Sequence, residues 1–457
     1  MVIVEYNLCR QVNDQTKIQH ICVHTGKEVS STGFQVLTIN KTIKGGVCMN
    51  SQVQKDGYSQ YRWVIMALMF ASFMLTFLAR FAWPPLIPVV VPVLKMNMSQ
   101  AGAYMTAFYI GYVITQVPAG MLADRFGVRT ILGVSLVIEG LSTWGMGSIS
   151  SFDTGFALRI ATGLGAGAMM ACCARALMEW FPPRERGTAF GLLLAAPSGG
   201  LLLANFIVPL LNAAFNWQGA FQGIGIATVV LGILIYCLVK TSDEPKGEKS
   251  FFGGFKVFFS NRNTVLVAIA GFCLMWMELG LATWANAYIK KLGFSVQEAG
   301  MVLIWYSVGG VIAPVVSGWI SDKLGNRKNI VIAAYAISAL LTIYFGSQTT
   351  LSMLNIVGFI YGFCSYAANP HLSLMVSEFA GKEWAATANG ITNFIFQLAS
   401  MIGPLVLGGV IDLTGNFSTV WYMMAVGPVV GILMLWPLRP PSAEQTGLAG
   451  GVGKSSK

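Results

Sequence analysis

The chain has 457 residues, of which 55% are hydrophobic and only 11% are charged. Soluble domains carry roughly 25% charged residues, so this composition excludes an ordinary soluble protein. The formal net charge of +10 does not indicate a nucleic-acid partner, because the basic residues lie in loops between apolar segments, as they do in membrane proteins.

Residues 1–59 come first and do not share the apolar pattern. They are polar and lack the apolar core of a signal peptide. Lys44-Gly45-Gly46 lies just ahead of Met49, and a purine-rich ribosome-binding sequence encodes Lys-Gly-Gly when it is read in frame. We therefore expect translation to start at Met49. The alternative is a true cytosolic extension.

Twelve apolar spans follow, each near or above the roughly 20 residues that cross a hydrocarbon core. Together they predict an all-α membrane protein with two pseudo-symmetric bundles of six helices, residues 60–240 and 263–438. A linker at 241–262 joins the bundles, and a tail at 439–457 is expected to be disordered. The spans lie at 63–92, 101–123, 130–150, 153–181, 187–212, 218–240, 264–289, 297–321, 329–346, 352–377, 385–411 and 418–437.

The distribution of Lys and Arg predicts the orientation in the membrane. Most of these residues fall on the side that holds both termini, whereas the loops of the other side hold Lys95, Lys290 and Lys291. Cytoplasmic loops carry the excess of basic residues, so both termini are expected in the cytoplasm. The aromatic linker segment Phe251–Phe259 is expected to lie on the inner leaflet.

The stretch from Ala101 to Arg129 recurs at Ala299 to Arg327 without a gap. Each copy is an apolar helix that ends in a charged turn. Two such copies in a membrane chain indicate two homologous halves, the architecture of many secondary transporters. The turn residues are Gly120, Asp124, Arg125, Gly127 and Arg129 in the first copy, and Gly318, Asp322, Lys323, Gly325 and Arg327 in the second.

These features resemble the major facilitator superfamily, from Gln60 to Leu438. A second match is the Arg-x-x-x-Gly-x-Gly pattern that starts at Arg159. The resemblance implies that Asp124 and Asp322 face the N-termini of the eleventh and fifth helices, where a carboxylate meets the positive end of a helix dipole. The charged turns would then form a cytoplasmic gate. The alternative is a tight turn whose charges only set the topology.

Trp180 to Gly187 is similar to the loop after the fourth helix in the anion:cation symporter branch, whose members carry organic anions, usually with protons. That branch often has Asp-Arg in the first helix and a Glu seven residues after the arginine of the fourth. Here these positions read Ala79-Arg80 and Ala166. Both arginines are present and both carboxylates are missing, which favours anion binding and leaves the proton route open.

Charges inside apolar spans are costly and invite functional hypotheses. Arg80 is predicted to bind an anion, because a guanidinium offers a planar bidentate fork, and the alternative is an ion pair between helices. Arg159 has three open roles: substrate binding, tuning of a proton acceptor, or structure. Arg175 is expected to pair with Glu179 one turn away or to snorkel. Glu139 would pair with Arg175 or another basic group, or stay protonated.

In the second half, Glu278 is the candidate for proton coupling, because apolar surroundings favour a protonated carboxyl. A structural or substrate-contacting role is the alternative. His371 is either a buried neutral histidine or a proton-sensitive substrate contact. Further candidates for substrate binding are Trp276, Asn369 and Asn393, and Asn393 belongs to a polar stripe with Asn389 and Gln397 that could instead join helices.

The sequence therefore predicts a transporter of a small organic anion, a carboxylate, coupled to protons and embedded as a monomer in the lipid bilayer of the cytoplasmic membrane. No nucleotide-binding loop, metal cluster or catalytic triad is evident in the sequence, so we expect no cofactor, no bound metal and no enzyme activity. The alternatives are anion exchange without protons, efflux of drugs or metabolites, and a membrane sensor that does not transport.

Overall fold

The computed structural model describes residues 7–9, 20–22, 60–182, 185–240, 258–324 and 326–438. It leaves out the side chains of residues 7–9 and 20–22 and those of Val117, Asp124, Asp322, Lys382, Glu383 and Ala386. The chain divides into two compact units, Met1–Gly57 and Tyr58–Lys457. In the first, β1 (Asn7–Cys9) and β2 (His20–Cys22) pair antiparallel, with Leu8 opposite Ile21. The expected start at Met49, the segment 251–257 and the tail lie outside the described residues.

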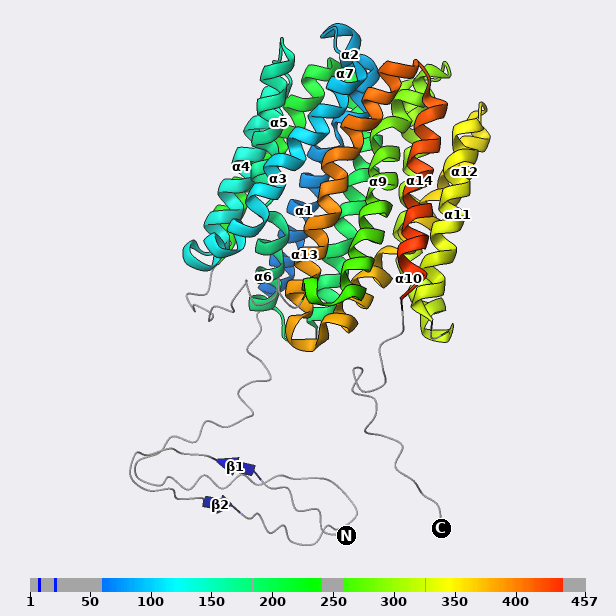
Figure 1. Ribbon diagram of the computed structural model, residues 1–457. Coiled ribbons are helices and arrows are strands. Elements are labelled where there is room, and N and C mark those ends of the chain that lie inside the picture. Colours follow the sequence, from blue (N-terminus) through cyan, green and yellow to red (C-terminus); the bar gives the residue numbers. More distant parts are fainter. Residues whose placement is uncertain are drawn as a thin grey trace, which may run out of the picture. The chain divides into compact units, whose positions relative to one another are not determined.

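The described part of the second unit consists of helices and short connections (Figure 1). Its helices are α1 (Tyr61–Phe81), α2 (Trp83–Val93), α3 (Met98–Phe126), α4 (Val128–Met146), α5 (Phe152–Ala166), α6 (Met169–Trp180), α7 (Arg186–Leu238), α9 (Arg262–Lys291), α10 (Val296–Leu324), α11 (Arg327–Ser347), α12 (Leu351–Tyr366), α13 (Asn369–Thr414) and α14 (Phe417–Leu435).

The described residues contain nine helical segments that are long and apolar enough to cross a membrane. The predicted number of twelve spans stays a prediction. Two long helices contain a break where two of the expected spans meet: α7 is non-helical at Phe215 and Asn216, and α13 is non-helical at Gly381. Gly381 has φ of 75°, a left-handed conformation that favours glycine.

Three expected spans are each divided in the structure. The first breaks at Ala82 between α1 and α2, the fourth at residues 167–168 between α5 and α6, and the tenth at residues 367–368 between α12 and α13. Pro84 and Pro370 follow two of these breaks and cannot donate a backbone hydrogen bond to the preceding turn. The breaks free backbone carbonyls inside the protein, and side chains can bind them.

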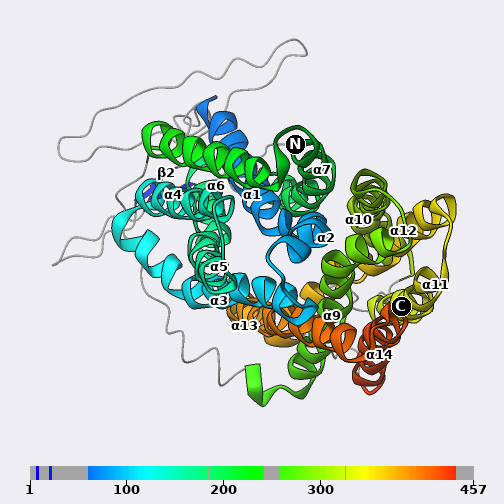
Figure 2. The ribbon, with the colours of Figure 1, turned by 90° about the horizontal axis from the view of Figure 1, so that it is seen from above.

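The helices gather into two bundles (Figure 2). We call α1–α7 the N-terminal bundle and α9–α14 the C-terminal bundle. Large aromatic side chains fill both, and Trp83 in the first and Trp284 in the second are 0% exposed. Asparagine caps several helices, because its side chain accepts from a free N–H of the first turn; Asn97, for example, forms a capping box with Gln100.

Candidate functional site

Arg80 is almost completely buried near the end of α1, at 3% exposure. Four aromatic rings surround its guanidinium, with ring centroids between 4.2 and 5.1 Å from the central carbon: Phe77 from α1, and Phe108, Tyr109 and Tyr112 from α3. Aromatic faces stabilise a cation without neutralising it. Within the described residues Nε and Nη2 make no hydrogen bond, so these donors are available to an anion.

Arg159 is fully buried on α5, and its guanidinium is occupied by backbone carbonyls. It donates to the oxygens of Ala79 at 3.2 Å, Arg80 at 2.9 Å and Tyr104 at 3.4 Å. The carbonyl of Arg80 needs this donor, because residue 84, its partner in a regular helix, is proline. Among the open roles of Arg159, these contacts favour the structural one: Arg159 holds the backbone that carries Arg80.

Glu139 lies on α4 and is 0% exposed. It accepts a hydrogen bond from Thr76, whose Oγ1 lies 3.0 Å from its Oε2. Arg175, one of the partners expected for Glu139, forms an ion pair with Glu179 at 2.9 Å instead, which confirms the pair predicted from the spacing of four residues. The carboxyl of Glu139 lies within electrostatic range of Arg80.

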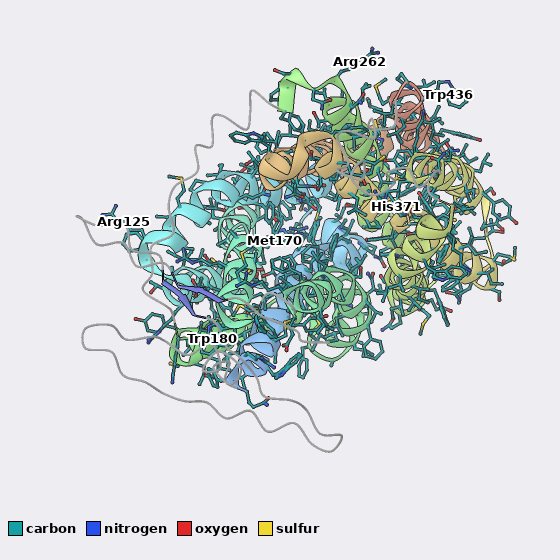
Figure 3. All side chains as sticks on the ribbon, turned by 90° about the horizontal axis from the view of Figure 1, so that it is seen from below. Arg125, Met170, Trp180, Arg262, His371 and Trp436 are labelled. Carbon is teal, nitrogen blue, oxygen red and sulfur yellow. The ribbon has the colours of Figure 1, made fainter. Side chains whose placement is uncertain are left out.

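The C-terminal bundle brings together Glu278 of α9 and Asn369 of α13. Glu278 is 6% exposed, and its Oε1 accepts a hydrogen bond of 3.2 Å from the amide nitrogen of Asn369. His371 is buried two residues beyond Asn369 and lies towards the middle of the molecule in Figure 3.

The other predicted substrate contacts lie elsewhere in the C-terminal bundle. The indole nitrogen of Trp276 donates to the carbonyl of Met423 at 3.1 Å, which directs this side chain towards α14. Asn393 is half-buried on α13 and accepts a long hydrogen bond from Gln397, at 3.5 Å. These two contacts are internal to the bundle, and they favour helix packing over substrate binding for Trp276.

The two bundles are joined by hydrogen bonds at one end of the molecule, where α3 begins and α13 ends. The backbone N–H groups of Met98 and Ser99 donate to the carboxylate of Asp412, at 2.8 and 2.7 Å. About two helical turns further along α3, Thr106 donates to the carbonyl of Met401 at 2.6 Å. We call this the α3–α13 end.

Glycines on the helices that face the other bundle are packed differently at the two ends of the molecule. Near the α3–α13 end, a Cβ at Gly102 would overlap the backbone of Pro404, and one at Gly300 would overlap the backbone of Asn205. At the opposite end of the same helices, a Cβ at Gly120 would meet only Ala171 of its own bundle, at 3.8 Å. At these described glycines, the opposite bundle is in close contact at the α3–α13 end and is not within 4 Å at the other end.

The charged turns lie at this opposite end, which we call the basic end. No atom of the opposite bundle lies within 4 Å of the place of a Cβ at Gly120 or Gly318. The side chains of Asp124 and Asp322 and all of Gly325 lie outside the described residues, so their predicted partners stay predictions.

The other basic residues of the turns contact groups within their own bundle. Arg327 forms an ion pair with Glu378. Arg129 stacks on Tyr236 at 4.6 Å, Lys323 on Trp319 at 3.7 Å, and Arg125 on Phe126 at 5.3 Å. Gly127, with φ of 79°, ends α3 in a conformation that favours glycine, which explains the residue at this turn.

Residues 68–404 and 290–455 match the sequence profile of the Major Facilitator Superfamily. The chain belongs to the Major Facilitator Superfamily. It is thus a multi-pass membrane protein of a transporter family and not an enzyme, as the sequence predicted. This membership confirms the predicted all-α fold class with two bundles.

Individual relatives are similar over most of their length. A probable galactarate/D-glucarate transporter of Bacillus subtilis is 27% identical over 74% of this chain and 83% of its own. A hexuronate transporter of the same organism is 24% identical over 79% of this chain and 90% of its own. A solved structure of a bacterial homologue of the human lysosomal transporter Spinster superposes with a TM-score of 0.71 at 15% identity, over 83% of this chain and 97% of that one.

Sequence reasoning missed the three rings that α3 contributes around Arg80. Their signal was available, because Phe108 and Tyr112 are four residues apart and therefore lie on one face of the helix. It could not be read as a site, since aromatic residues at this spacing occur in any apolar span. Only the packing of α3 against α1 shows that the face covers an arginine.

Proposed function

We propose that the protein is a secondary active transporter that moves a small organic anion, a carboxylate, by alternating access between its two bundles. The observation that carries this proposal is Arg80: a buried guanidinium, held among aromatic rings, with two donors free of hydrogen bonds. A carboxylate that accepts from both donors would neutralise the charge and complete the hydrogen bonds. The organic acids named for the two relatives belong to this chemical class.

The proposal includes proton coupling through Glu278. This buried carboxyl lies in the bundle opposite Arg80 and has an amide, Asn369, as its hydrogen-bond partner. An amide can donate to the carboxylate and accept from the carboxylic acid, so it tolerates both protonation states. A carboxyl that binds and releases one proton per cycle needs this tolerance. His371, buried beside Asn369, would respond to the same change of charge.

The basic end is proposed to face the cytoplasm, since cytoplasmic loops carry the excess of Lys and Arg. Both termini would then be cytoplasmic. On this orientation the structure corresponds to an inward-facing state, with the α3–α13 end closed towards the outside. The charged turns would close the basic end in the outward-facing state.

Arg80→Lys tests anion binding, because it keeps the charge and removes the planar fork. We expect the affinity for glucarate or a hexuronate to fall by about 1–3 kcal/mol, the value of a charge-assisted contact, which is roughly 5- to 150-fold in Kd. Binding to the purified protein measures the affinity, and counterflow in proteoliposomes measures transport. Arg175→Lys is the matched control, since its ion pair with Glu179 survives the change. Normal binding by Arg80→Lys contradicts the proposed site.

Glu278→Gln separates coupling from binding within the same experiment, since the amide imitates the protonated carboxyl. The variant should bind and exchange the anion but should accumulate less of it than the wild type in response to the same proton gradient. Accumulation equal to that of the wild type would assign the coupling to another group and leave the anion site intact.

A further inference from the structure

Glu139 is a fully buried carboxyl beside the Arg80 site that the proposed function does not use. We propose that Glu139 is a proton-binding counter-ion of Arg80: an anion bound at Arg80 favours the protonated form of Glu139, so that the anion and a proton bind together. The inference rests on the proposed function, because it requires an anion at Arg80.

The geometry places Glu139 next to the site without direct contact to the guanidinium. Thr76, which donates to Glu139 at 3.0 Å, precedes Arg80 by one helical turn on α1, so both lie on one face of that helix. The second oxygen of Glu139, Oε1, makes no hydrogen bond within the described residues. It also forms no ion pair there at 4 Å or less. A buried carboxylate with one neutral partner depends on more distant charges to stay ionised.

Two cations oppose the cost of burying this charge. Burial disfavours the ionised carboxyl most strongly, and Arg80 from α1 and Arg159 from α5 act in the opposite direction. The other elements packed on α4 add no described charge near Glu139. From α7 come Gly225, Val229 and the neutral Thr228. From α3 come aromatic rings around Arg80, and from α6 come the thiols of Cys172 and Cys173, which are 0% exposed among apolar side chains. Among the described residues, Glu139 is thus a carboxyl on which Arg80 acts.

The packing of α5 keeps the carboxyl at this depth. A Cβ at Gly165 would lie 2.8 Å from the Cβ of Glu139 and 2.5 Å from the carbonyl oxygen of Ser135. The α4 and α5 backbones therefore meet directly at Glu139, and the carboxyl has little room to move away from the arginines. Its charge must be compensated where it lies.

Anion binding changes this compensation. A carboxylate on Arg80 uses the positive charge that had stabilised ionised Glu139, and the two anions also repel each other. A proton then passes from water to Glu139, converting its carboxylate to a carboxylic acid. For a monoanionic substrate the net charge of the site is the same before and after binding. The charges of the anion and of the proton cancel when both enter this low-dielectric region together. Each anion that binds is therefore linked to the uptake of one proton.

The first test observes the carboxyl itself. Infrared difference spectra of the purified full chain, recorded on adding a hexuronate at constant pH, should show a new carbonyl band of a buried carboxylic acid. The band should be missing in Glu139→Gln and present in Glu278→Gln. A band that persists in Glu139→Gln overturns the inference.

The second test measures how affinity depends on pH. Uptake of one proton predicts that the Kd for the hexuronate rises up to about tenfold per pH unit in the range where free Glu139 is ionised. Glu139→Gln should bind with the low-pH Kd at every pH, whereas Glu278→Gln should keep the slope. Thr76→Val removes the hydrogen bond to the carboxylate and should move the sloping range to higher pH; Thr76→Ser should restore it.

The outcomes separate the two proposals. If Arg80→Lys weakens binding but Glu139→Gln keeps the pH slope, the counter-ion role of Glu139 is wrong and the anion site stands. If Arg80→Lys binds normally, the anion site is wrong. Should the wild type bind none of the organic acids, both are overturned. Thr76→Val leaves the carboxyl in place, so it still decides the question if Glu139→Gln does not fold.

Discussion

Arg80 and Arg159 are two buried arginines of one bundle with opposite surroundings. Arg159 makes three hydrogen bonds to carbonyls, whereas Arg80 has aromatic rings on its faces and free donors at its edge. The difference originates in Pro84, which cannot donate to the carbonyl of Arg80. A charged donor from α5 fills that position, and the backbone of Arg80 is fixed as a result. Arg159 is accordingly a positioning residue for the proposed anion site.

The positioning role of Arg159 predicts that a second substitution, at Pro84, partly rescues the Arg159→Lys variant. Arg159→Lys should lower the melting temperature and weaken anion binding, because an ammonium cannot span three carbonyls; the loss is about 2–3 kcal/mol. Pro84→Ala returns an N–H to the helix. In the double variant it should recover part of the melting temperature and part of the affinity for the anion. Thermal unfolding with and without anion gives the readout. A direct substrate contact by Arg159 would instead abolish binding without a loss of stability, and Pro84→Ala would not help.

At the scale of helices, α3 and α13 hold the bundles together through a helix N-terminus. The first N–H groups of α3 have no partner inside the helix, and Asp412 from the opposite bundle accepts from two of them. The positive end of the 29-residue helix also attracts the carboxylate. Asn205 of α7 and Asn286 of α9 add a buried amide pair at 3.1 Å between the bundles.

Asp412→Ala should therefore loosen the α3–α13 end. The contact is solvent-exposed, so we expect a shift of only about 1 kcal/mol, or roughly fivefold in the balance of states. A cysteine placed at Thr106 should react faster with an impermeant thiol reagent in this variant. Asp153→Ala is the control, because Asp153 lies in the first turn of α5 and does not bridge the bundles. Equal reaction rates in the two variants would show that Asp412 does not hold the closure.

At the scale of the whole molecule, the two ends differ although the two bundles are built from related sequences. Side chains labelled at the periphery in Figure 3, such as Arg125 and Trp436, surround a central region that is flanked by Met170 and His371. Gly102 of α3 and Gly300 of α10 meet the opposite bundle at one end, and a Cβ at Gly191 or Gly318 at the other would meet nothing within 4 Å. Transport by alternating access requires this asymmetry to reverse.

Cross-linking tests the reversal in a cysteine-free background. The Ser99 hydroxyl lies 3.9 Å from the place of a Cβ at Gly409, so Ser99→Cys with Gly409→Cys should form a disulfide on oxidation. Transport should stop and should return on reduction. The control pair, Gly191→Cys with Gly318→Cys at the basic end, should remain open to a hydrophilic thiol reagent. Transport by the oxidised first pair would mean that the α3–α13 end does not open in the cycle.

The sequence by itself determined what depends on spacing along one helix. The apolar spans, the repeated charged turn and the Arg175–Glu179 pair follow from residue type and helical period, and the structure confirms the pair. The presence of Arg80 inside an apolar span likewise marked it as a candidate, because a charge there is costly.

Only the tertiary structure decided which partner each buried group has. Thr76 and Glu139 are 63 residues apart, Arg159 and Arg80 are 79 apart, and Met98 and Asp412 are 314 apart. The helical period fixes the face on which a side chain lies but not the helix that packs against that face. The hydrogen bond from Arg159 to the carbonyl of Arg80, which Pro84 leaves without a backbone donor, is a property of this packing. For the same reason the role of Glu139 became visible only beside Arg80.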